Sequence, residues 1–184
     1  MVRTFIALPL PQMIQQSIAH AGEVLHQSDA EIKDVAPLLM HITLKFLGEV
    51  SEERIKVIAT VLKKISMTSF EIRIGPISAN SKRNPRVIWA QVSDEERCLA
   101  LFTQVEQLLV PLGFSPESRP FQPHITVARV KRPHQDIYSI LDSLSSTTYG
   151  SCTIDRCVLM KSVLSPQGPV YSELTEVRFE PISP

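Results

Sequence analysis

The spacing of apolar residues predicts strands alternating with helices along the chain. A short apolar run over residues 2–8 has the length of a buried strand and ends at Pro9 and Pro11. Over residues 11–27, apolar side chains recur every three or four positions, which predicts an amphipathic helix. The same reasoning predicts strands over residues 41–47, 70–77, 86–92, 124–130, 152–163 and 170–179, and helices after Ser51, after Ser93 and from Ile137 to Leu144.

Two of these helices carry sequence signals for their first residues. Ser51 is a residue type favoured as an N-cap, where its hydroxyl accepts a backbone N–H. Ser93 and Glu96 have the three-residue separation of a capping box. The apolar spacing of the second helix predicts a buried stripe of Leu99, Phe102, Val105 and Leu109.

The chain contains an internal repeat. Displacing it by 83 residues places His41 on His124 and Thr43 on Thr126, with no gap between the preceding predicted elements. Both copies end in the tripeptide His-Ile-Thr, which makes a duplicated structural unit the simplest interpretation.

The repeat predicts an α+β fold within a single domain, residues 1–184. The two copies, residues 3–47 and 86–130, would form two lobes related by a pseudo-twofold axis. Additional C-terminal strands over residues 150–180 would complete the domain. In this arrangement the two His-Ile-Thr strands face each other across a cleft.

Strand geometry gives each motif a chemical face. Side chains two positions apart lie on one side of a strand, so His41 and Thr43 share a face, as do His124 and Thr126. The opposite face is predicted to pack in the core; it carries Ile42, Leu44 and Phe46 in the first strand and Ile125 and Val127 in the second.

Two facing His-Thr pairs suit in-line displacement at phosphorus. A neutral histidine can take a proton from water while a protonated histidine on the opposite side gives one to the leaving oxygen. The threonine hydroxyls can bind the non-bridging phosphate oxygens, where charge accumulates in the transition state. From the residues alone, either histidine fits either role.

Composition argues against several other classes. The net charge is zero, so a broad nucleic-acid-coating surface is not expected, although a small phosphate site is compatible with it. Cys98, Cys152 and Cys157 show no CxxC spacing, and neither histidine motif has an adjacent carboxylate or HExxH spacing, so no metal site and no cofactor are expected. Apolar runs are too short to span a membrane and no signal peptide is evident, which predicts a cytoplasmic protein.

The segments His41–Gly48 and His124–Arg129 resemble the paired signature motifs of the 2H phosphoesterase superfamily. They are most similar to its RNA 2′,3′-cyclic phosphodiesterase branch, also called 2′-5′ RNA ligases. The resemblance extends along the whole chain and includes Arg3–Leu8, Pro85–Trp89, Phe121–His124 and the segment from Ser162 to Tyr171.

This resemblance implies a bilobal α+β fold in which antiparallel sheets line a central cleft and helices lie outside. It also implies metal-independent hydrolysis of a terminal 2′,3′-cyclic phosphate, leaving RNA with a 2′-phosphomonoester. By motif order, His41 would be the proton donor and His124 the proton acceptor, with Thr43 and Thr126 binding the phosphate. The implied partner is RNA, for example a tRNA-like fragment, with no membrane and no obligatory protein partner. Ligation through a 2′-5′ linkage would be the same chemistry reversed.

Four further residues are candidate RNA contacts: Arg129, Arg3, Arg86 and Phe5. Arg3 and Arg86 are equivalent in the repeat. Strict alternation puts Arg129 on the face away from His124, so its contact with substrate requires a β-bulge or a strand end.

Two other functions remain open on the sequence. One is a module that binds RNA ends or nucleotides without turnover. The other is a cyclic phosphodiesterase that acts on a small molecule.

Overall fold

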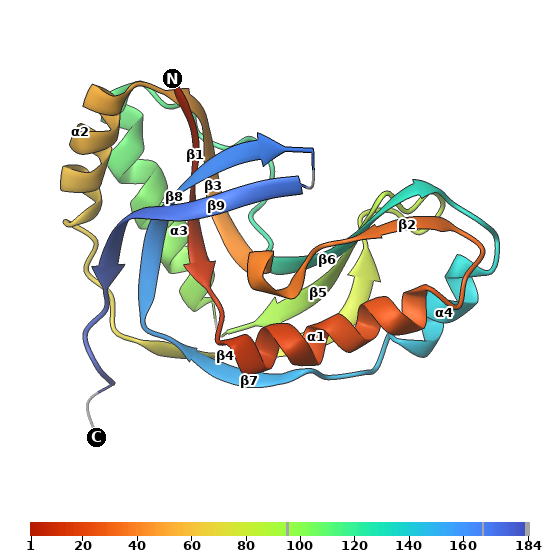
Figure 1. The fold of residues 1–184 in the computed structure, drawn as a ribbon. Coiled ribbons are helices and arrows are strands. Elements are labelled where there is room, and N and C mark those ends of the chain that lie inside the picture. The colour runs from red at the N-terminus through yellow and green to blue at the C-terminus, as the bar shows by residue number, and fades with distance from the viewer. Residues whose placement is uncertain (95, 167, 183–184) are drawn as a thin grey trace.

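The computed structural model describes residues 1–94, 96–166 and 168–182, which form an α+β fold. One curled antiparallel sheet carries two pairs of α-helices at opposite ends of the molecule (Figure 1). The elements are β1 (Val2–Pro9), α1 (Gln12–Leu25), β2 (Glu31–Asp34), β3 (His41–Val50), α2 (Glu52–Leu62), β4 (Phe70–Ala79), β5 (Val87–Ser93), α3 (Arg97–Leu109), β6 (His124–Arg132), α4 (Ile137–Ser143), β7 (Gly150–Ile154), β8 (Arg156–Ser165) and β9 (Gly168–Arg178).

The two repeat units share one sheet, whereas the sequence predicted separate sheets on either side of a cleft. The strand order is β7-β4-β5-β6-β3-β1-β8-β9, with β2 also paired to β6. The two halves join where β3 meets β6 through a single residue pair, Ile42 with Ile125. These are equivalent residues of the repeat, as expected for a pseudo-twofold axis passing between the two motif strands.

The helices exchange between the halves. The helix α1 follows β1 but packs with α4 against β6 and β7, and α3 follows β5 but packs with α2 against β3. Each repeat unit therefore buries its helix on the sheet of the other unit. This exchange joins both units in one hydrophobic core that runs the length of the sheet.

The predicted helix starts are right in one case and wrong in the other. Ser51 caps α2, because its hydroxyl accepts the backbone N–H of Arg54 at 3.3 Å. The capping box at the start of α3 does not form: Glu96 is in the left-handed region with a φ of 66°, and the Asp94 carboxylate accepts the Cys98 N–H instead. The buried stripe of α3 is Cys98, Leu101, Val105 and Leu109, which leaves the predicted core residue Leu99 41% exposed.

A β-bulge interrupts β3 beyond its His-x-Thr motif. Consecutive residues of β1 pair with Lys45 and Thr43, so Leu44 is left without a partner in the ladder. Leu44 and Lys45 are both buried, and side-chain alternation resumes one position later. Phe46, predicted in the core, is consequently 67% exposed on the same side as His41.

The strand β6 has the same bulge in the equivalent place. Consecutive residues of β5 pair with Ala128 and Thr126, and Val127 is passed over. Val127 and Ala128 are both buried, which turns Arg129 to the face of His124. This is the bulge that contact between Arg129 and the site requires.

The strand β2 has no counterpart in the predictions. It is short and polar, with the sequence Glu-Ile-Lys-Asp, so no hydrophobic alternation marks it. It lies beside the distal part of β6, where β3 has diverged from that strand. No helix among the described residues is long and apolar enough to cross a membrane.

Candidate active site

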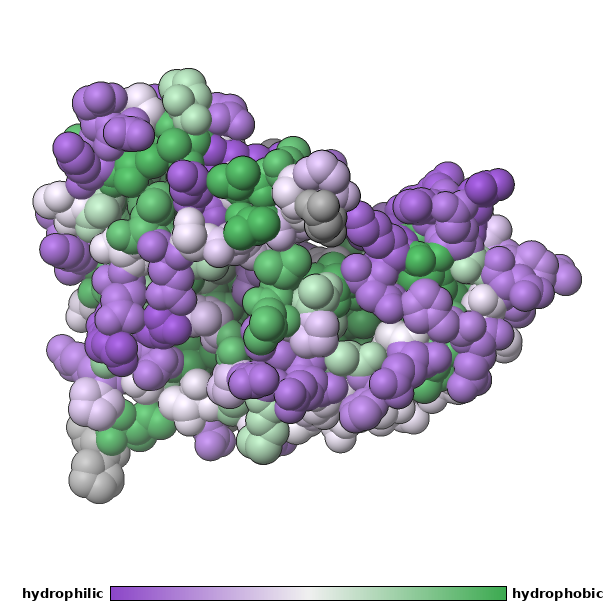
Figure 2. Space-filling model, viewed as in Figure 1, coloured by the Kyte–Doolittle hydropathy of each residue, from purple (hydrophilic) through white to green (hydrophobic). Residues whose placement is uncertain are grey.

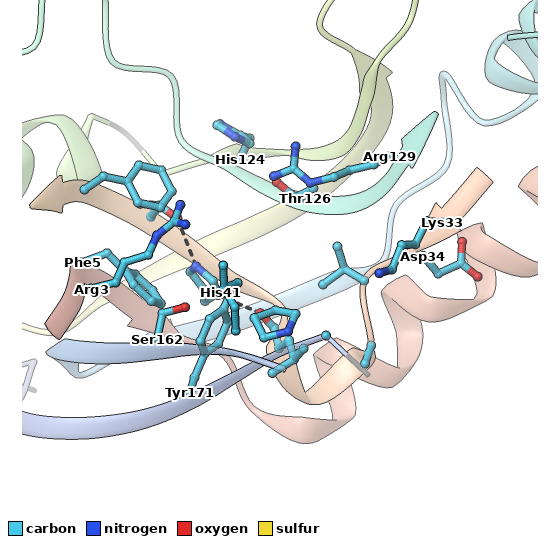
Figure 3. Close-up of a pocket in the computed structure, with 18 residues that line it drawn as sticks. Arg3, Phe5, Lys33, Asp34, His41, His124, Thr126, Arg129, Ser162 and Tyr171 are labelled. Atoms are coloured by element: carbon cyan, nitrogen blue, oxygen red, sulfur yellow. Dashed lines mark hydrogen bonds between the residues drawn. The ribbon is translucent and has the colours of Figure 1, made fainter. Parts of the chain in front are cut away.

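Both His-x-Thr motifs line one cavity of about 350 Å³ (Figure 3). His41 and Thr43 come from β3, and His124 and Thr126 come from the neighbouring strand β6. The sequence-based expectation that the four side chains share one site agrees with this geometry. The remaining lining residues include Arg3, Phe5, Lys33, Phe46, Arg129, Ser162, Leu164 and Tyr171.

The two imidazoles are held in the same way. The Nδ1–H of His41 donates to the Leu39 carbonyl at 2.7 Å, and the Nδ1–H of His124 donates to the Gln122 carbonyl at 2.9 Å. A carbonyl only accepts, so each contact fixes the proton on Nδ1. The Nε2 atoms are therefore left available for proton exchange, and that of His41 lies 3.0 Å from the Thr43 hydroxyl.

The surroundings of the two histidines differ. His41 packs against Phe5 at 5.0 Å between ring centroids and against the edge of Tyr171 at 5.6 Å. His124 packs against Trp89 at 4.8 Å. Burial lowers the pKa of His41 below its ordinary value, the Leu39 hydrogen bond opposes this effect, and the nearby His124 reinforces it.

Three cationic side chains line the cavity: Arg3, Lys33 and Arg129. Among the residues that the structure describes, none of the three has a carboxylate within ion-pair distance or a side-chain hydrogen bond. Both guanidiniums lie close enough to Tyr171 to oppose the rise that burial causes in its pKa. Unpaired cations that converge on a cavity indicate an anion-binding site.

The other predicted RNA contacts lie in different places. Arg86 does not line the cavity; its guanidinium donates to the Lys131 carbonyl at 2.7 Å, so the symmetry with Arg3 is not maintained. Phe5 borders the cavity but is only 3% exposed, and it mainly supports the His41 ring.

The side chains of Lys33, Ser162 and Tyr171 were not predicted as site residues. Ser162 pairs with Arg3 across β1 and β8, and with Tyr171 across β8 and β9, which brings the three together beside His41. Tyr171 and Ser162 lie in a segment of family resemblance, but only pairing with the N-terminal strand places them at the site.

The walls of the site differ in character. In the space-filling view, hydrophobic side chains form patches among hydrophilic ones in the region of β8 and β9, while the end of the molecule that holds β2 is mainly hydrophilic (Figure 2). Leu164, on the β8 side, is 69% exposed and lines the cavity.

A cluster of possible metal ligands lies apart from the cavity lining. Asp29, His134 and Asp136 bring one ligand atom each within 4.8 Å of one another. The Asp136 carboxylate accepts hydrogen bonds from the Ser28 hydroxyl and the Asp29 backbone N–H, which lower its pKa to about 2. These bonds tie the residues after α1 to the start of α4, which is a structural role.

The fold, the two His-x-Thr motifs and the cavity that they line are the features expected of a phosphodiesterase. The model of the 2′-5′ RNA ligase superfamily matches residues 11–165, and the chain belongs to this family. Similar proteins include the RNA 2′,3′-cyclic phosphodiesterase of Archaeoglobus fulgidus, 32% identical over 94% of this chain and 98% of the relative. That of Aeropyrum pernix is 34% identical over 90% of this chain and 92% of its own length.

Solved structures share the fold. A Thermus thermophilus protein superposes with a TM-score of 0.78 at 26% identity, covering 96% of this chain and 97% of its own. Escherichia coli LigT complexed with 3′-AMP superposes with a TM-score of 0.80 at 24% identity, covering 97% and 98%.

Proposed function

We propose that this protein hydrolyses the 2′,3′-cyclic phosphate at the 3′ end of RNA and leaves a 2′-phosphomonoester. The observation that carries the proposal is the pair of His-x-Thr motifs on adjacent strands of one cavity. Each histidine there has its Nδ1 committed to a backbone carbonyl, which leaves Nε2 for proton transfer. The membership of the family and the names of its relatives support the same activity.

The proposed reaction is an in-line displacement by water. The Nε2 of His124 takes a proton from the water as its oxygen bonds to phosphorus, and the bond from phosphorus to the 3′ oxygen breaks. The Nε2 of His41 donates its proton to that leaving oxygen. Thr43 and Thr126 donate hydrogen bonds to the non-bridging oxygens, and the unpaired cations of the cavity stabilise the phosphate charge.

The environment of His41 suits a proton donor. A lowered pKa makes its imidazolium a stronger acid towards the leaving oxygen. The anionic cyclic phosphate raises the pKa again when it binds, because it stabilises the protonated ring. Substrate binding thereby loads the proton that the reaction consumes, and no metal is needed for charge neutralisation in this scheme.

The RNA end would be recognised on both sides of the phosphate. Phe46 and Arg129 project into the cavity from equivalent positions of the two motif strands. An aromatic ring and a guanidinium both stack on the face of a nucleobase without strong base preference. Ligation would follow from the same chemistry if the 5′-hydroxyl of a second RNA replaced water as the attacking group.

The test is hydrolysis of a short RNA that ends in a 2′,3′-cyclic phosphate, in the presence of EDTA. We expect a product that co-elutes with the 2′-phosphate standard and not with the 3′-phosphate. A 3′-phosphate would reverse the proposed leaving group, loss of turnover in EDTA would contradict metal independence, and absence of any product would refute the activity.

The roles of the two histidines are tested with a substrate that has sulfur in place of the 3′ oxygen. A thiolate leaves with little need for a proton, because its pKa is about 8.5. We expect His41→Ala to regain most of its lost turnover on this substrate and His124→Ala to regain none. Rescue of His124→Ala instead would exchange the two roles.

A further inference from the structure

Trp89 of β5 packs beside His124 without lining the cavity. Its ring centroid lies 4.8 Å from that of the imidazole, and the two ring planes are inclined by 42°. Trp89 pairs with Thr126 in the antiparallel ladder, so its side chain lies on the face of the sheet that carries the second motif. It is partly buried and is not among the residues that line the cavity, so an effect on the reaction has to act through His124.

The other repeat unit has an alanine in this place. Ala7 of β1 pairs with Thr43, as Trp89 of β5 pairs with Thr126. The displacement of 83 residues aligns Trp89 with Ile6 instead, so the equivalence appears only in the strand pairing. Both motifs read His-Ile-Thr, but only the second one has an indole opposite its threonine.

The imidazole of His124 has few other supports. Its Nδ1–H donates to the Gln122 carbonyl, and its Nε2 has no hydrogen-bond partner among the residues that the structure describes. The Nε2 of His41, by contrast, lies 3.0 Å from the Thr43 hydroxyl. The indole of Trp89 is therefore the side-chain contact that limits rotation of the His124 ring about its single hydrogen bond.

The indole also suits the charge that His124 would gain. In the proposed reaction the proton of the attacking water moves to Nε2, and the ring becomes an imidazolium. Trp is the best aromatic partner for a cation within about 6 Å of its ring centroid. His41 loses its charge in the same step and packs against Phe5, which is a weaker partner for a cation. A contact that strengthens as the proton moves stabilises the transition state more than the bound substrate.

We propose that Trp89 is the positioning residue of His124. It holds the ring with Nε2 towards the substrate and stabilises the imidazolium that proton transfer creates, while forming no bond to the substrate itself. The inference rests on the proposed hydrolysis. It gives a structural reason why His124, and not His41, accepts the proton although the two motifs are identical.

The kinetic test replaces the indole without changing its shape. Trp89 is the only tryptophan of the chain, so growth on a tryptophan analogue alters this position alone. Analogues with more fluorine atoms on the indole have less electron density on the ring face. We expect kcat to fall with each added fluorine, by up to about tenfold, with KM and the melting temperature unchanged.

Conventional variants complete this test. Trp89→Phe should retain more activity than Trp89→Leu, because it keeps an aromatic face. Tyr138→Leu is the matched control, since it removes a ring of α4 that does not line the cavity, and it should alter neither kcat nor KM.

Two kinetic results would overturn the inference. One is a kcat that falls in Trp89→Leu but does not respond to fluorination, which would show that the indole only fills space. The other is a rise in KM with unchanged kcat, which would place Trp89 on the substrate.

Intrinsic fluorescence tests the contact without turnover. An imidazolium next to an indole quenches its emission much more than a neutral imidazole does. We therefore expect the emission of the substrate-free protein to fall between about pH 8 and pH 5, the interval in which histidine ordinarily gains its charge. The decrease should persist in His41→Asn and disappear in His124→Asn.

The His41 variant is needed because other ionisable groups lie near His124. The charged and titratable side chains that share the cavity with it are Arg3, Lys33, Asp34, His41, Arg129 and Tyr171. Loss of quenching in His41→Asn instead of His124→Asn, or emission that does not change with pH, would overturn the contact whatever the turnover. A failure of hydrolysis with the expected quenching would contradict the proposed function and leave the contact between Trp89 and His124 established.

Discussion

Phe46 and Arg129 stand in the same place in the two repeat units, five residues after His41 and His124. Each reaches the cavity because a β-bulge shifts the side-chain alternation of its strand. The histidines and threonines proposed to be catalytic repeat identically, but this position is aromatic in one unit and cationic in the other. The difference makes the nearly symmetric cavity asymmetric at this position, which in the proposed reaction gives the bound nucleotide one direction.

Replacing Phe46 tests the stacking role. Stacking of a base on an aromatic side chain is worth about 1–3 kcal/mol, so Phe46→Ala should lower kcat/KM for the RNA substrate by about tenfold. Phe46→Tyr should keep most of the activity, because it preserves the aromatic face. Steady-state kinetics measures the effect.

Thermal unfolding provides the control for that experiment. The ring is 67% exposed, so its removal should change the melting temperature little. Unchanged kinetics with a clearly lower melting temperature would show that Phe46 serves the fold and not the substrate.

If the proposed mechanism holds, each of the two histidines should be indispensable on its own. A single proton-transfer role is typically worth about 10²–10⁴-fold, and we expect His41→Ala and His124→Ala each to lose turnover in that range. The double variant should turn over substrate only slightly more slowly than the less active of the two single variants, because both groups act in one step. Circular dichroism shows whether the variants fold, and a folded single variant within a few-fold of wild type would contradict paired acid–base catalysis.

The protonation of His41 should depend on whether the cavity is occupied. Burial favours the neutral ring, so its pKa in the free protein should lie below the ordinary value of 6.5. Inorganic phosphate or a 2′-mononucleotide should raise it, because the anion favours the imidazolium. NMR titration measures both values, with His41→Ala used to assign the signal, and a pKa above 6.5 in the free protein would contradict the effect of burial.

The same shift predicts how stability depends on pH. Since the folded-state pKa lies below the unfolded-state value, the unfolded chain binds more protons in the interval between them. The contribution of His41 to the free energy of unfolding is complete above about pH 6.5 and is lost as the pH falls through the folded-state pKa. Denaturation curves at several pH values should therefore show that acid lowers the free energy of unfolding less for His41→Gln than for wild type. Equal decreases in the two proteins would argue against a lowered pKa of His41.

Local patterns were sufficient to predict that the two His-Thr pairs share one cavity. His41 and Thr43 are two residues apart on one strand, and the repeat points to their counterparts, so both pairs follow from alternation alone. Alternation failed three residues later, because the bulges arise from pairing with β1 and β5. The expected core position of Phe46 was therefore wrong. Arg129 does reach the face of His124, through the β-bulge that its contact with the substrate was expected to require.

Long-range pairing accounts for the remaining differences. The short strand β2 has no hydrophobic pattern, so Lys33 could be placed only after β2 was seen beside β6. Ser162 and Tyr171 come from the far end of the chain and reach His41 because β8 pairs with β1 and β9 pairs with β8. Two lobes were expected, but the pairing of Ile42 with Ile125 joins them in one sheet.

The bulge of β3 also creates a buried ion pair. Lys45, which the bulge turns inward, contacts Glu106 of α3 and donates to the Ser115 carbonyl at 2.9 Å. The second carboxylate oxygen of Glu106 accepts the backbone N–H of Glu117 at 3.1 Å. The pair therefore fixes the loop between α3 and β6, the strand that begins with His124.

Removing one partner of this ion pair should lower the free energy of unfolding far more than replacing both partners with apolar side chains. A lone buried charge is uncompensated, so Lys45→Met should lower the free energy of unfolding by about 3–5 kcal/mol. Adding Glu106→Leu should recover most of that loss, because two apolar side chains of similar volume are tolerated where a single charge is not. Urea denaturation of the wild type, both single variants and the double variant measures the coupling. If the double variant were as unstable as the sum of the two single ones, the side chains would act independently and the proposed tie between the bulge and the loop would be wrong.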